Sequence, residues 1–103
     1  MPYSVRLADR VHKTLEALPA EIRYEVETHL KSLASFPESG DVLNFPFAGA
    51  RSWTFVVPVP NGERGFSVLH IPDPKRQVVE VVGLGEINLH PGAGDRPLPS
   101  SPE

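Results

Sequence analysis

The first third of the chain changes from a strand pattern to a helical pattern. Residues 3–8 alternate apolar and polar side chains, which is the period of a half-buried strand. Residues 10–18 repeat apolar side chains at i, i+4 and i+7, which predicts a short helix with Asp9 as its N-cap. Pro19 is expected to end this helix and to open a second one over residues 19–33. The apolar stripe of the second helix comprises Ile22, Val26, Leu30 and Leu33.

The second half of the chain predicts three strands joined by two turns. Residues 37–50 read as an irregular loop, and the strands are expected at about 52–59, 64–71 and 77–84. The stretch "PNGE" places Asn61-Gly62 at the centre of a two-residue type I′ hairpin.

The second turn has different chemistry. The stretch "DPKR" suits a type I turn with Asp73 at its first position and Pro74 at its second. The element order is therefore β-α-α-β-β-β, an α+β fold in which two N-terminal helices pack on one face of a small antiparallel sheet. Residues 1–87 are expected to form a single domain, and the Pro/Gly-rich residues 88–103 a flexible tail.

The predicted turns also assign each strand residue to a face of the sheet. A loop at Asn61-Gly62 pairs Trp53 with His70, and the face that they share is apolar enough to receive the helices. His70 is therefore expected in the core rather than in a catalytic role. The opposite face is expected to be partly solvated, with Thr54, Ser67 and Glu80 on it.

Composition narrows the classes of function. The chain has 103 residues, a net charge of -3 and no cysteine, which excludes disulfides, thiol nucleophiles and cysteine-based zinc sites. The histidines lack the spacing of metal ligands, so neither a metal nor a small-molecule cofactor is expected. No apolar run is long enough to cross a membrane and no secretory signal is visible, so a cytoplasmic protein is expected. Any binding of nucleic acid would depend on a local basic cluster.

The order of elements and several stretches of sequence resemble the RelE/ParE superfamily of toxins from bacterial type II toxin-antitoxin systems. These stretches are "SVRLADRVHKTLEALPAEIRYEVETHLKSLASFP", "GARSWTFVV", "FSVLHIPD" and "VVEVVGLG", within residues 3–87. The resemblance implies one N-terminal strand, a helical hairpin and a three-stranded meander. It also implies a cognate antitoxin as partner, and either cleavage of mRNA on the ribosome or inhibition of DNA gyrase.

The sequence departs from the RNA-cleaving members at their basic positions. Those members tend to have Arg or Lys on the second strand, Arg on the third, and a Gly-His-Arg...Tyr-like end of the fourth. This chain has Thr54 and Ser67 at the first two positions, and it ends "GLGEINLH", without Arg or Tyr. Cleavage through attack of a 2′-hydroxyl needs a base, an acid and a cation that stabilises the transition state, and neutral side chains cannot supply the cation.

Other residues are candidates for these roles. If the last strand runs on, Glu86 and His90 lie on the same solvated face as Glu80, and they are the candidate base and acid, beside Ser67 at the substituted position. The alternative is that these two residues belong to a strand end and a flexible tail without a catalytic role. The candidate contacts to nucleic acid are Arg51, Arg64, Lys75 and Arg76.

The sequence therefore predicts the toxin of a type II toxin-antitoxin system, with mRNA interferase activity as the first expectation and the ribosome and mRNA as further partners. Two alternatives stay open. One is a non-catalytic ParE-like protein that inhibits a target such as DNA gyrase by protein contact, and the other is a binding module that shares only the fold.

Overall fold

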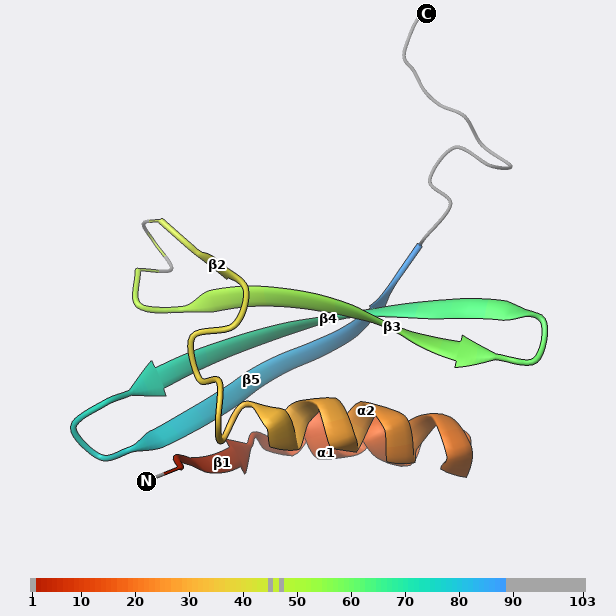
Figure 1. Cartoon of the computed structure of the whole chain (residues 1–103), viewed down its shortest axis with the longest axis horizontal. Coiled ribbons are helices and arrows are strands. Elements are labelled where there is room, and N and C mark those ends of the chain that lie inside the picture. The colour runs from red at the N-terminus through yellow and green to blue at the C-terminus, as the bar shows by residue number, and fades with distance from the viewer. Residues whose placement is uncertain (1, 45, 47, 89–103) are drawn as a thin grey trace, which may run out of the picture.

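Two helices lie on one face of a five-stranded sheet (Figure 1). The computed structural model describes residues 2–44, 46 and 48–88. The elements are β1 (Ser4–Leu7), α1 (Asp9–Glu16), α2 (Ala20–Ser32), β2 (Asp41–Val42), β3 (Arg51–Val59), β4 (Gly62–Asp73) and β5 (Val78–Ile87). The strand order is β1-β5-β4-β3-β2. This arrangement confirms the α+β fold with the helices on one face. Within the described residues, no helix is long and apolar enough to cross a membrane.

The sheet is mixed, so the expectation of a wholly antiparallel sheet was wrong for its first strand. β1 runs parallel to β5, with Ser4 opposite Val78 and Leu7 opposite Val81, while the other neighbours are antiparallel. A parallel pair needs a long connection, and the whole helical hairpin and meander lie between these two strands. The short β2, within the segment expected to be a loop, pairs with the beginning of β3.

The first helix begins one residue earlier than predicted and the second begins one residue later. Ala8, in an extended conformation, is the N-cap of α1, and its carbonyl accepts the His12 N–H at 3.1 Å. Asp9 lies in the first turn instead, where its carboxylate interacts favourably with the positive end of the helix dipole. Pro19 directly precedes α2 and accepts the Arg23 N–H at 2.8 Å, so it separates the helices as expected.

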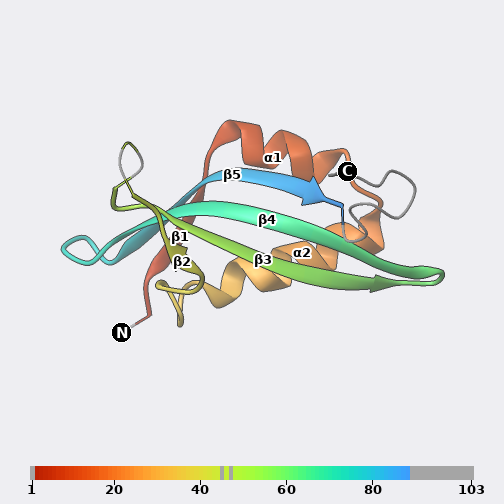
Figure 2. The same ribbon diagram turned by 90° about the horizontal axis from the view of Figure 1, so that it is seen from above.

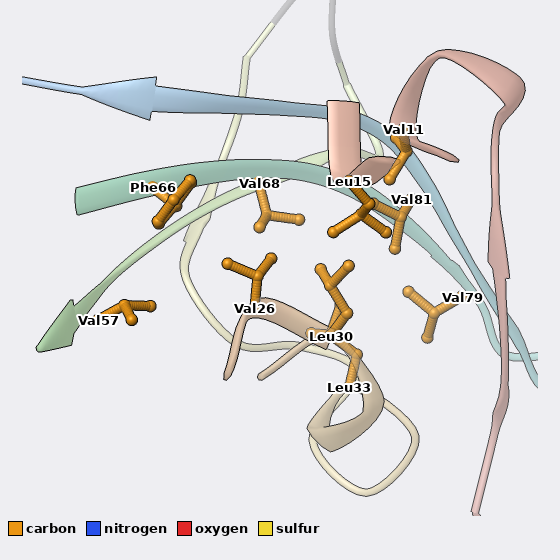
Figure 3. Packing of buried hydrophobic residues seen from close by; sticks show 10 residues of the cluster. All are labelled: Val11, Leu15, Val26, Leu30, Leu33, Val57, Phe66, Val68, Val79 and Val81. Carbon is orange, nitrogen blue, oxygen red and sulfur yellow. The ribbon is translucent and has the colours of Figure 1, made fainter. Parts of the chain in front are cut away.

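The core lies between the helices and one face of the sheet (Figure 3). α1 contacts β5 and α2 contacts β3, and Figure 2 shows the helices side by side beneath these strands. The helical stripes predicted from the sequence supply half of the buried cluster. Its members are Val11, Leu15, Val26, Leu30, Leu33, Val57, Phe66, Val68, Val79 and Val81. We call this side of the sheet the covered face.

The first hairpin turns one residue earlier than predicted. Val59 pairs with Gly62, so the loop is Pro60-Asn61 rather than Asn61-Gly62. Type I′ turns need positive φ at both central residues, whereas proline fixes φ near -65° and suits the first central position of an ordinary turn. Accordingly, Asn61 is not among the residues with positive φ. Every cross-strand pair is therefore displaced by two positions, and because two is even, each side chain stays on its predicted face.

The second hairpin contains the irregularity that changes the active-site expectation. Asp73 pairs with Val78, so the turn covers residues 74–77, and the Asp73 carboxylate accepts the Arg76 N–H at 3.2 Å, as expected of the first turn position. A β-bulge interrupts the register between Leu69 and His70. The bulge adds one residue to β5. Each later residue of that strand therefore points to the opposite face of the sheet from the one predicted.

Candidate functional site

The side of the sheet opposite the helices is the candidate site that the sequence indicated. We call it the open face and define it by Thr54, Val56, Ser67, Leu69, Ile71, Glu80, Gly85 and Ile87. Ser67 lies at its centre, opposite Thr54 on β3 and Gly85 on β5. Large apolar side chains are exposed around it, with Val56 43% exposed and Ile71 39% exposed. The open face is thus neutral at its centre and apolar around it.

Strand pairing puts few charges near the centre of this face. Arg6 pairs with Glu80, which pairs with Ile71, so Arg6 is the one cation that pairing places on the open face within the described residues. Ile71 lies four residues from Ser67 along β4, or about 13 Å at the rise of an extended strand. Four carboxylates are added to the same face by Asp41, Glu63, Asp73 and Glu80. The centre of the open face therefore has no described cation or carboxylate within direct reach.

Arg51, a candidate for contact with nucleic acid, is held by the loop that precedes β3. Its Nη1 donates to the Glu38 carbonyl at 3.0 Å and to the Gly40 carbonyl at 3.3 Å. Gly40 has φ of +89°, and a Cβ there would lie 2.3 Å from the Ser52 carbonyl oxygen, so glycine is required for this close approach. Arg51 pairs with His70 and belongs to the covered side.

Arg64 and Glu86 form an ion pair on the covered side, near the beginning of α2. Two guanidinium nitrogens of Arg64 donate to the two carboxylate oxygens, each at 2.7 Å. This hydrogen bonding raises the pKa of Arg64 and lowers the pKa of Glu86. Glu86 pairs with Phe66, whose side chain is in the core, so Glu86 and Ser67 lie on opposite faces.

The expected parity of Glu86 was therefore wrong, because the bulge reverses it. A carboxylate held by two charge-assisted hydrogen bonds is also a weaker base than a free one. His90, the expected acid, lies outside the described residues, and so does most of the expected tail. Lys75 and Arg76 are exposed in the turn at one end of the sheet, where Arg76 lies 3.9 Å from the Asp73 carboxylate. The structure thus brings Arg64 and Glu86 together as an ion pair and separates this pair from Ser67, which lies on the other face.

His70 is buried on the covered face, as the sequence predicted, although its partner across the strands is Arg51 rather than Trp53. It is fully buried, and neither ring nitrogen makes a well-aligned hydrogen bond within the described residues. Burial lowers the pKa of His70, and the positive charge of Arg51 lowers it further, whereas the nearby carbonyls of Pro37 and Ser39 raise it by a smaller amount. His70 is consequently a neutral packing residue at neutral pH.

An aromatic cluster at the β3 side was missed by the sequence reasoning. The His29 ring of α2 stacks on Phe55, with centroids 4.1 Å apart and an angle of 3° between the ring planes. Trp53 lies 5.1 Å from Phe55 and 6.1 Å from His29. The sequence contained one indication of it. Glu21, Glu25 and His29 recur every fourth residue, so they lie on one side of a helix. The described residues contain no group of side chains that could hold a metal ion.

Comparison with known proteins identifies the fold. No family model and no curated protein matches the sequence. Among solved structures, the RelBE2 toxin-antitoxin complex of Mycobacterium tuberculosis matches with a TM-score of 0.69 at 20% identity, over 84% of this chain and 93% of that one. The isolated RelE toxin of E. coli matches with a TM-score of 0.61 at 14% identity, over 85% and 87% of the two chains. The chain has the fold of the RelE toxins.

The intact E. coli RelBE toxin-antitoxin complex also matches, with a TM-score of 0.59 at 14% identity, over 84% of this chain and 98% of that one. The resemblance stated from the sequence is thus confirmed for the fold. Thr54 and Ser67, the neutral residues at positions where the resemblance implied basic side chains, both lie on the open face. Cationic side chains are described at the margins of the sheet and not at its centre.

Proposed function

We propose that the chain is the toxin component of a type II toxin-antitoxin system, held inactive by a cognate antitoxin in the cytoplasm. The observation that carries this proposal is the RelE fold over 84% of the chain and 93% of a chain from a toxin-antitoxin complex. A match over nearly the whole of both chains leaves little room for a different architecture around a shared motif.

For the mode of action, we infer inhibition of a target protein by contact. Val56 and Ile87 are exposed on either side of Gly65, and Ile71 is exposed further along β4, all on the open face. Exposed apolar side chains are common in protein interfaces. A phosphate backbone would instead be held by clustered Lys and Arg, and its cleavage would need a cation at the reacting phosphate. Among the described residues, strand pairing places only Arg6 on the open face, at its margin.

Cleavage of mRNA on the ribosome is the second candidate, because the neighbours in structure are RelE toxins. An interferase of this sequence would have to draw its cations from Arg51, Arg64, Lys75 and Arg76. Arg51 and Arg64 already hold partners, and Lys75 and Arg76 lie in the turn at the end of the sheet. Ser67, Glu86 and His90 would supply the remaining chemistry, although Glu86 lies on the other face from Ser67.

Induced expression in a bacterial host tests both candidates. We expect growth arrest without new mRNA ends in primer-extension maps, together with loss of activity of the target protein, for which supercoiling by purified DNA gyrase is the first assay. Arrest accompanied by codon-linked mRNA cuts would transfer the assignment to the interferase. The absence of arrest by the full chain, expressed to a level confirmed by immunoblotting, would contradict the toxin proposal itself.

A further inference from the structure

The outer edge of β3 is unpaired over most of its length. β2 pairs only with Arg51 and Ser52, and no other described strand lies outside β3 (Figure 2). The Leu43 N–H donates to the Ala50 carbonyl at 3.0 Å, which shows that Ala50 directs its backbone groups to this edge. Alternate residues of a strand direct these groups to the same edge, so Thr54 and Val56 present an N–H and a C=O there.

Proline limits this edge at the hairpin end. Pro58 has the same parity as Thr54 and Val56, so the N–H that it lacks is one that would point outward rather than to β4. Proline at such a position prevents pairing along the whole strand, as in many protected sheet edges. The edge available for pairing is therefore the short segment of residues 53–57.

A groove beside this edge is walled by α2. It has a volume of about 450 Å³ and lies between Glu21, Ile22 and Glu25 on the helix and residues 57–61 of the hairpin. Further along α2, His29 stacks on Phe55. A strand added to β3 would alternate its side chains between the open face and this helical wall.

The wall is acidic near the hairpin. The carboxylates of Glu21 and Glu25 take part in neither of the ion pairs of the described residues. Arg64 also lines the groove, but Glu86 neutralises it through two hydrogen bonds of 2.7 Å. A basic side chain next to Val57 would therefore meet uncompensated negative charge, while one next to Trp53 or Phe55 would meet aromatic rings.

We propose that residues 53–57 of β3 accept an extended segment of the antitoxin as an added strand. On its helix-facing side this segment has an apolar or aromatic residue near Phe55 and basic residues near Glu21 and Glu25, and on its other side small or β-branched residues. Backbone hydrogen bonds give such an added strand affinity, and the alternate side chains give it specificity. The inference rests on the proposed function in one respect only, namely that the added strand comes from an antitoxin.

Binding of a synthetic peptide to the purified full chain tests the edge without the antitoxin. The probe is an acetylated, amidated peptide with the sequence Phe-Thr-Val-Thr-Lys-Thr-Lys. Its binding is followed by anisotropy of an attached fluorophore and by emission of Trp53, which is the only tryptophan. The variant Val56→Pro removes one outward N–H and leaves the β4 side intact, and it should weaken binding about tenfold, as expected for one lost hydrogen bond. The matched variant Val56→Thr should bind within about twofold of the wild type.

Charge and backbone pairing are separated by two further measurements. Glu21→Gln together with Glu25→Gln should weaken binding about threefold to tenfold and reduce its dependence on salt. A peptide methylated at its alternate, edge-facing nitrogens should lose binding, and it replaces Val56→Pro if that variant fails to fold. If the methylated peptide, or a peptide with Glu in place of Lys, bound as tightly as the original peptide, the proposal would be overturned.

A second copy of the chain is the competing occupant. If the wild type is a dimer in light scattering and Val56→Pro makes it a monomer, the edge belongs to a homodimer and the antitoxin proposal is overturned. A monomer that binds the lysine peptide supports it. These outcomes are independent of growth arrest, so failure of the edge proposal and failure of the toxin proposal remain distinguishable.

Discussion

The two faces of the sheet use the same strands for different purposes. On the covered face, neighbouring strands contribute Phe66, Val68, Val79 and Val81 to one cluster with the helices. On the open face, one residue along, the same strands present Ser67 and Gly85 with exposed aliphatic side chains around them. Most of the apolar burial therefore lies on the covered face, and the described side chains of the open face contribute little to the core.

The largest expected effect follows from adjacent residues on opposite faces. Phe66 is 1% exposed, so Phe66→Ala should lower the free energy of unfolding by about 3–5 kcal/mol through lost burial and an unfilled cavity. Ser67→Ala, one residue along β4, should change it by no more than about 0.5 kcal/mol. Urea denaturation followed by circular dichroism measures both values. Equal destabilisation by the two variants would show that the open face is also packed.

A smaller effect on stability is expected from His70, which should make the stability of the covered face depend on pH. The pKa of His70 is lowered in the folded protein, so as the pH falls the unfolded chain takes up a proton first. The stabilisation from this neutral ring is complete above about pH 6.5, the ordinary histidine value, and is lost as the pH falls from there toward the folded-state pKa. His70→Leu should therefore show a smaller loss of stability than the wild type over this window, in urea titrations at several pH values.

Val79→Ala is the matched control for this comparison, because Val79 is also fully buried on the covered face but does not titrate. It should lower the stability at every pH and keep the slope of the wild type. If the stability of His70→Leu depended on pH as steeply as that of the wild type, groups other than His70 would have to cause the pH dependence.

The sequence predicted the covered face well and the candidate site poorly, for a physical reason. Face assignment depends only on parity, so it survived a hairpin register displaced by two positions around Pro60. One added residue in β5 was enough to move Glu86 to the other face, and nothing in the run "VVEVVGLG" marks where a bulge falls. The partners of Arg51, which are backbone carbonyls of a loop, could not be inferred from side-chain patterns either.

A small expected change in stability accompanies the most informative change in function. Ile71 is 39% exposed on the open face, so Ile71→Lys should change the free energy of unfolding by only about 0.5 kcal/mol. If the open face holds a protein target through apolar contact, the buried lysine charge should abolish growth arrest. If the same face holds RNA, an added cation should maintain or strengthen binding, because phosphate contacts increase with positive charge.

The two modes of action therefore predict opposite signs for one substitution, measured as growth after induced expression. Thr28→Lys adds the same charge at an exposed position of α2, on the helical side, and should leave the arrest unchanged. Ile71→Val keeps the apolar contact and should also retain it. Arrest that persists in Ile71→Lys, with its folding verified by circular dichroism, would argue against protein contact through the open face and would favour RNA as the target.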